Sequence, residues 1–180
     1  MVAKRLELLR ELVPGAARVP VLVNPANTTS TSTLRDVTEA ARTTGVQILI
    51  RRPGTIREIN LAFEALAHER PDALLVAGDA LFSSRRVQLV HLATRHTIPA
   101  TYSQREFVDI GGLMSYGPNL SDAFRQIGLY VGRILNGAKP AGLPVEQSSK
   151  FELVINAGTC GLLDLAIPPT LLSIADEVIE

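Results

Sequence analysis

Amide and hydroxyl side chains follow the first apolar run of the sequence. This run, "RVPVLVN" at residues 18–24, ends at Asn24, and the next stretch, "PANTTSTS", adds Asn27 and Ser30. Amides and hydroxyls both donate and accept hydrogen bonds, so they can bind the polar part of a small molecule. The same residue types also form turns and cap helices. We therefore hold two interpretations of the stretch: a helix cap, and one wall of a ligand site.

Acidic and aromatic residues accompany three later apolar runs. Asp79 follows "DALLVAG", Glu106 follows "IPATYS", and a tyrosine lies within "LMSYGPN". A carboxylate can bind a ligand ammonium, and aromatic rings can contact an apolar part of the same molecule. As an alternative, Asp79 caps a helix and the rings belong to the core. We expect a ligand site made of Asn24, Asn27, Ser30, Asp79, Phe82, Tyr102, Glu106 and Tyr116.

No set of residues indicates catalysis. A dinucleotide site needs G-x-G-x-x-G after the first strand, and "NPANTTSTS" has no glycine. A phospho-receiver domain would use Asp79, but it also needs an acidic pair for a metal, where this chain has Asn24 and Asn27. Cys160 has no histidine nearby in sequence, and no Cys/His cluster suggests zinc. We expect a protein that is not an enzyme and that has no metal and no cofactor.

Composition narrows the class of protein further. The chain has 180 residues, 46% of them hydrophobic and 20% charged, with a formal net charge of zero. This is typical of a globular protein with one sizeable core, and it gives no indication of a nucleic-acid partner. Charged residues interrupt the opening "MVAKRLELLRELVPG", so we expect no signal peptide in it, and a cytoplasmic location if Met1 is the native start.

Strand-like and helix-like segments alternate along the first hundred residues. We expect strands at residues 18–24, 46–52, 72–78 and 98–103, and amphipathic helices at the start and at 32–44, 56–70 and 83–96. Such alternation predicts βαβ units. The expected fold is α/β, a doubly wound and mostly parallel sheet in a Rossmann- or flavodoxin-like three-layer sandwich. Ligands of such sheets bind beyond the carboxyl ends of the strands, where the candidate residues lie.

The pattern changes after Ser103. We expect a fifth strand at 113–119, then a helix at 121–137 with Ser121 as its N-cap and Gly137 at its end. A Pro/Gly/Ser linker follows at 138–150, then a sixth strand at 151–156 and a closing helix at 168–180.

Several phrases fit one known family. They are "KRLELLRELVPGAARVPVLVNPAN", "REFVDIGGLMSYGPN", "ILNGAKPAGLPVEQSSKFELVIN" and "IPPTLLSIADEVIE". With them the chain resembles the substrate-binding proteins of a bacterial ABC-transporter uptake family, which have the type I periplasmic-binding-protein fold. The resemblance implies two lobes joined by a three-strand hinge, an amino-acid-like solute bound between them, an ABC-transporter permease as partner, and a periplasmic location.

The resemblance also suggests how the chain divides. Residues 1–115 and 150–180 resemble the second lobe, and residues 116–149 resemble the segment that crosses into the first lobe and returns through the hinge linker. Relative to the family pattern, the chain begins where the second lobe would begin, without a signal peptide and most of the first lobe. We therefore expect the apolar residues of the crossing segment to pack on their own lobe or in a homodimer through residues 116–136. Two other functions stay open: a ligand-sensing domain of a regulator, and a small flavodoxin-like enzyme or receiver domain.

Overall fold

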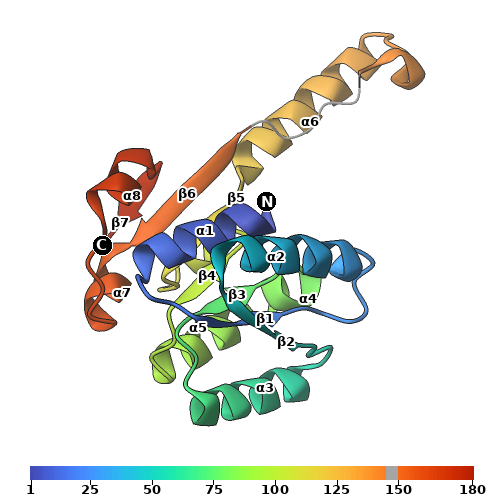
Figure 1. Cartoon of the computed structure of the whole chain (residues 1–180). Helices are drawn as coiled ribbons and strands as arrows, with labels where there is room; N and C mark the ends of the chain where they lie inside the picture. Colours follow the sequence, from blue (N-terminus) through green and yellow to red (C-terminus); the bar gives the residue numbers. More distant parts are fainter. Residues whose placement is uncertain (145–149) are drawn as a thin grey trace.

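A mostly parallel sheet forms the centre of the protein (Figure 1). The computed structural model describes residues 1–144 and 150–180, and in these the strand order is β2-β1-β3-β4-β5-β6-β7. Strands β1 to β5 pair in parallel, and β6 and β7 run antiparallel to them. The strands are β1 (Arg18–Leu22), β2 (Gln47–Arg51), β3 (Leu74–Val76), β4 (Ala100–Tyr102), β5 (Met114–Pro118), β6 (Phe151–Asn156) and β7 (Glu177–Ile179). The expected fold class is confirmed.

Helices cover both faces of this sheet. The helices are α1 (Val2–Leu12), α2 (Ser30–Thr44), α3 (Ile56–Glu69), α4 (Ala80–Ser84), α5 (Arg86–Arg95), α6 (Leu120–Leu135), α7 (Ala157–Leu162) and α8 (Pro169–Ile174), with 3₁₀ turns at Arg105–Phe107 and Pro140–Gly142. One hydrophobic cluster lies between the sheet and α1 with α2, and a second lies between the sheet and α3 with α5. The described helices include none that is both long and apolar enough to cross a membrane.

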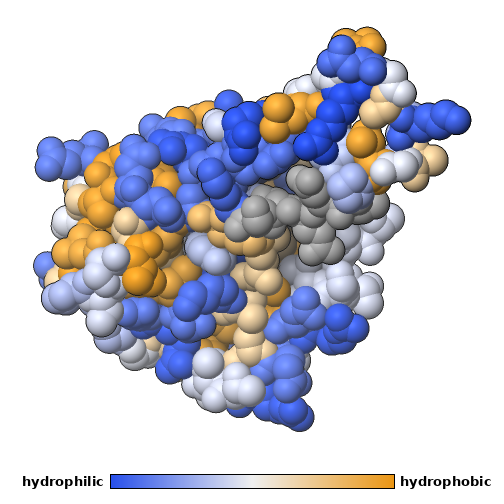
Figure 2. Space-filling model, turned by 90° about the horizontal axis from the view of Figure 1, so that it is seen from above, coloured by the Kyte–Doolittle hydropathy of each residue, from blue (hydrophilic) through white to orange (hydrophobic). Residues whose placement is uncertain are grey.

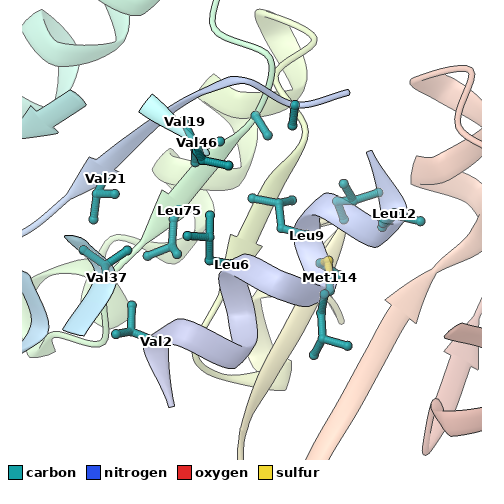
Figure 3. Close-up of a cluster of buried hydrophobic side chains, with 14 of the residues drawn as sticks. Val2, Leu6, Leu9, Leu12, Val19, Val21, Val37, Val46, Leu75 and Met114 are labelled. Carbon is teal, nitrogen blue, oxygen red and sulfur yellow. The ribbon is translucent and has the colours of Figure 1, made fainter. Parts of the chain in front are cut away.

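Helix α1 contributes the largest share of leucines to the first cluster (Figure 3). Leu6, Leu9 and Leu12 are fully buried against the sheet and α2, as their helical spacing predicts. Burying a leucine side chain stabilises a fold by about 1.5–3 kcal/mol. This packing fixes the start of α1 above the carboxyl ends of β4 and β5.

The C-terminal part differs from the sequence prediction. The closing helix stops at Ile174, and the chain continues as β7 beside β6. Asp176 explains the change, because its carboxylate accepts a hydrogen bond from the Leu153 N–H at 2.8 Å while its own N–H donates to the Leu153 carbonyl at 2.9 Å. These bonds turn the chain toward the sheet, where β7 pairs with β6, a pairing that no local sequence pattern reveals.

Two helix boundaries also need correction. Asn119, not Ser121, caps α6, since its side-chain oxygen accepts a hydrogen bond from the Asp122 N–H at 2.8 Å. The single helix expected at 83–96 is divided into α4 and α5 at Arg85. Part of the expected linker, residues 145–149, lies outside the described residues.

Helix α6 projects away from the sheet with the far ends of β5 and β6 (Figure 1). None of its residues is buried, and hydrophobic side chains lie among hydrophilic ones on this arm (Figure 2). The most exposed include Phe124 at 68% and Leu135 at 82% of their full area. The expectation that this segment packs on its own lobe is therefore wrong for the single chain.

Candidate functional site

Strands β1 and β3 mark the switch point of the sheet. The order β2-β1-β3-β4-β5 sends the chain first to one side of β1 and then to the other. The loops after β1 and β3 diverge at this point, and in open parallel sheets this is where ligands bind. Asn24 and Asn27 follow β1, and Asp79 follows β3, so the fold brings together three of the residues expected in the site.

Asp79 is held by the two asparagines. Asn24 Nδ2 donates to one carboxylate oxygen at 3.0 Å, and Asn27 Nδ2 donates to the other at 2.8 Å. The Leu81 N–H donates to the first oxygen at 2.8 Å, so Asp79 also caps α4. The sequence left two roles open for Asp79, a helix cap and a ligand contact. The structure shows the cap, which uses the first carboxylate oxygen, while the second oxygen accepts a bond from Asn27.

These hydrogen bonds set the charge of Asp79. Partial burial by itself would raise its pKa, but the bonds from Asn24, Asn27, and the backbone N–H groups of Leu81 and Phe82 outweigh burial and lower the pKa below the ordinary value. The side chain is half-buried. A carboxylate fixed in place and ionised at neutral pH can bind an ammonium group.

Ser30 supports the same loop. Its hydroxyl donates to the Asn24 carbonyl, and the residue itself is 9% exposed. The Thr29 N–H and hydroxyl both donate to Asn27 Oδ1, at 2.9 and 2.8 Å. The hydroxyl-rich stretch thus fixes the orientation of both asparagines where α2 begins.

A hollow of about 340 Å³ opens beside this cluster. It lies over the ends of β3, β4 and β5 and under the first turns of α1 and α2. Its lining residues are Met1, Val2, Arg5, Ser32, Thr33, Asp36, Gly78, Ser103, Gln104, Tyr116, Gly117, Pro118 and Leu120. The volume is within the range of small-molecule sites, roughly 300–1,000 Å³. Of the residues expected in the site, Tyr116 lines this hollow, and the Tyr116 ring stacks on Phe151 with 6.0 Å between centroids.

Two glycines shape the hollow. A Cβ on Gly117 would lie 1.9 Å from the Ser103 carbonyl oxygen, so only glycine lets β5 pass this close to the loop after β4. A Cβ on Gly78 would lie 3.3 Å from the Ser103 hydroxyl and would narrow the space.

The other three expected residues lie elsewhere. Phe82 and Tyr102 are each 1% exposed in the second hydrophobic cluster, and the Tyr102 ring stacks on Phe107 at 4.5 Å. They are core residues here, which corrects the expectation that they form walls of the site. Glu106 lies in the 3₁₀ turn after β4 and is not among the residues that line the hollow.

Sequence reasoning missed Arg5, which lies on α1 at the hollow. The residue is 5% exposed, its Nη1 donates to the Val76 carbonyl at 2.8 Å, and burial lowers the pKa of the guanidinium to about 10, so it stays charged at neutral pH. The sequence did contain a signal. Val2, Arg5, Leu9 and Leu12 follow helical spacing, so a cation occupies a position on the apolar stripe.

Nothing in the described part of the chain groups three or more His, Cys, Asp and Glu side chains into a metal site. Cys160 is buried, and burial raises the pKa of its thiol to about 11, so it is protonated at neutral pH. A protonated buried thiol is a poor nucleophile.

The fold and the site define a doubly wound α/β domain with a polar pocket at its switch point. The model of the family described as "ABC transporter substrate binding protein" matches residues 1–179, and the chain belongs to this family.

Individual relatives agree with the family model. The chain is 25% identical over 162 residues to a "Tyrosine-binding protein" of Clostridioides difficile (strain R20291), covering 90% of this chain and 47% of that protein. A Streptococcus "ABC domain in complex with L-Trp" is 25% identical with a TM-score of 0.88, covering 99% of this chain and 62% of that one. A Vibrio cholerae "conserved domain protein" also has a TM-score of 0.88, at 24% identity, covering 98% and 60%. The chain therefore spans about half to three fifths of the length of these relatives.

Proposed function

We propose that this chain forms the solute-binding lobe of an ABC uptake system and binds an amino-acid-like solute without catalysing a reaction. The observation that carries the proposal is the ionised Asp79, held by Asn24 and Asn27 at the switch point beside the 340 Å³ hollow. Support for an amino acid comes from the relatives, one named as tyrosine-binding and one solved with L-Trp.

The chain's division into parts belongs to the same proposal. Residues 1–115 and 150–180 form the second lobe, and residues 116–149 belong to the crossing segment. The projecting α6, with no buried residue, supports this division, because its apolar face is one that a first lobe would cover. A homodimer through residues 116–136 is the competing arrangement, and sizing by light scattering separates the two.

Partners and location follow from the family. Its members deliver a solute to a transporter and are typically periplasmic or extracellular. We propose an ABC permease as the protein partner, and the same location for the working form of this protein.

Ligand titration tests the proposal directly. The chain has no tryptophan, so a tryptophan fluorescence change during titration with L-tryptophan reports the ligand alone. We expect saturable binding of L-tryptophan or L-tyrosine, followed also by NMR shifts of the Asn24 and Asn27 side-chain amides, which detect weak binding. Absence of the fluorescence change with L-tryptophan, together with absence of the NMR shifts with every proteinogenic amino acid, would contradict the proposed function for this chain.

A pair of variants locates the binding. Asp79→Ala should weaken binding at least tenfold, because a ligand ammonium loses its carboxylate. Glu64→Ala, on the exposed side of α3 across the sheet, removes the same charge and should leave binding unchanged. Equal binding by both variants would place the solute away from the switch point.

A further inference from the structure

Arg5 is a buried cation without a counter-charge. Across residues 1–144 and 150–180, the one hydrogen bond of its side chain is the Nη1 contact to the Val76 carbonyl, and no carboxylate lies within ion-pair distance of the guanidinium. Arg105, by contrast, pairs with Glu177 at 3.0 Å and Asp109 at 3.3 Å. Taking a guanidinium out of water is costly unless an anion or several hydrogen bonds compensate.

The remaining N–H donors of Arg5 can find a partner in the hollow that this residue lines. A guanidinium has five N–H donors, and the Val76 carbonyl uses one. Arg5 is one of the residues that line the 340 Å³ hollow, so this space is where its other donors can meet a ligand. Arginine binds a carboxylate through two parallel hydrogen bonds, a geometry that an anion in the hollow can adopt.

The remaining lining is compatible with an anion. Ser32, Thr33 and Ser103 contribute hydroxyls, and Gly78 leaves room. Asp36 is the one carboxylate in the lining, and its oxygen accepts hydrogen bonds from Arg35 at 3.2 and 3.3 Å. It therefore already has a cation, and that cation is not Arg5.

The two charges of the site lie on neighbouring structural elements. Arg5 lines the hollow, and Asp79 directly follows Gly78, which lines it too. An α-amino acid has an ammonium and a carboxylate on the same carbon, so a ligand whose carboxylate meets Arg5 has to place its ammonium toward Asp79, which itself does not line the hollow. Tyr116, stacked on Phe151, provides an aromatic surface in the same hollow.

We infer that Arg5 is the carboxylate-binding residue of this site and makes it selective for a zwitterionic α-amino acid over the corresponding amine or amide. The inference rests on the proposed function and adds the ligand group that Arg5 recognises. The competing reading gives Arg5 a structural role only, joining α1 to β3 through the Val76 carbonyl.

The test compares two probes that differ in the carboxylate. L-tryptophan and L-tryptophanamide share the ammonium and the indole ring, and only the first has a carboxylate. We expect wild type to bind L-tryptophan at least tenfold more tightly than the amide. Arg5→Gln should abolish this preference by weakening L-tryptophan binding at least tenfold while leaving the amide unchanged. Lys4→Gln, which removes the same charge from the exposed neighbouring position, should behave as wild type.

Each outcome decides the inference. Equal loss of both probes in Arg5→Gln, or no loss of either, overturns the role of Arg5 while the proposed function stands. If Arg5→Gln does not fold by circular dichroism, Arg5→Lys replaces it, because lysine keeps the charge but loses the two-pronged geometry and should give a smaller loss of the same preference.

A further probe separates failure of the inference from failure of the proposed function. If wild type binds neither tryptophan compound, the proposed function fails for this ligand. Acetate is then added to wild type while the NMR shift of the Arg5 Nε–H is followed. A saturating shift supports a carboxylate subsite, and an unmoved resonance overturns it.

Discussion

Replacing Asp79 by alanine removes the acceptor that holds Asn24 and Asn27 at the switch point; we call these three residues the switch-point cluster. The carboxylate accepts three hydrogen bonds, from Asn24 at 3.0 Å and from Asn27 and the Leu81 N–H at 2.8 Å each. The helix cap contributes about 1 kcal/mol. The two amide bonds to a charged acceptor contribute about 1.5–3 kcal/mol each when buried. Because Asp79 is half-buried, water can replace part of these hydrogen bonds in the variant. We therefore expect Asp79→Ala to lower the free energy of unfolding by about 2–3 kcal/mol.

Urea unfolding followed by circular dichroism measures this loss, and thermal unfolding should show a Tm lower by about 4–12 °C, at about 2–4 °C per kcal/mol for a chain of this size. A double-mutant cycle with Asn27→Ala isolates one bond and should give a coupling energy of about 1 kcal/mol. If the free energy of unfolding of Asp79→Ala is within about 0.5 kcal/mol of wild type, as for ordinary surface substitutions, the switch-point cluster does not stabilise the fold.

Acid provides a second check of the same reasoning. The pKa of Asp79 is lowered in the folded state, so its stabilisation is fully present above the ordinary pKa of about 3.9 and is lost as the pH falls through the lower folded value. The stability difference between wild type and Asp79→Ala should therefore be constant at neutral pH and shrink below about pH 4. A difference that persists unchanged in strong acid would mean that charge plays no part.

Three further predictions concern other positions. Gly117→Ala should destabilise the chain by about 1–3 kcal/mol in urea unfolding, since the new Cβ would lie 1.9 Å from the Ser103 carbonyl oxygen; an unchanged midpoint would contradict this close approach. Gly128→Ala should stabilise α6 by about 0.5–1 kcal/mol, because, beyond the neighbouring backbone of α6 itself, no atom of the described residues lies within 4 Å of a Cβ at that position. If the variant is instead less stable than wild type at high protein concentration, a partner molecule packs against Gly128. Glu152→Gln should raise Tm at pH 7: burial raises the pKa of Glu152 more than the Asn119 hydrogen bond lowers it, so the charged form is unfavourable in the folded state. This gain should fade as the pH falls through the folded pKa, and a gain independent of pH would refute its electrostatic origin.

Helix α6 of the projecting arm exposes apolar side chains. Helix α6 is amphipathic, yet it covers none of its own sheet. An exposed apolar face of this kind marks a contact surface. Strand β5 leads into this helix and also contributes Tyr116 and Gly117 to the lining of the hollow.

Local pattern predicted much of this protein from the sequence. Alternation of apolar runs with amphipathic segments indicated the three layers, since each βαβ unit has one stable way to pack. Helical spacing indicates that Leu6, Leu9 and Leu12, and likewise Ile59, Phe63 and Leu66, share the inward side of their helices, and the structure buries the two sets in separate clusters. Turn residues after the strands pointed to Asn24, Asn27 and Asp79, because carboxyl ends of parallel strands meet at one edge.

Long-range packing decided the rest. Tyr102 ends β4 and Phe82 lies in the short helix α4 after β3, positions where sequence alone allows either a site or a core role, and tertiary packing buries both in the second hydrophobic cluster. Strand β7 exists because Asp176 bonds to Leu153, a residue on another element of the chain. Arg5 looks in sequence like one more charge on a helix. Its burial, its bond to a carbonyl 71 residues away and its place at the hollow arise only when α1 packs over β4 and β5, since no local pattern encodes which distant groups will surround a side chain.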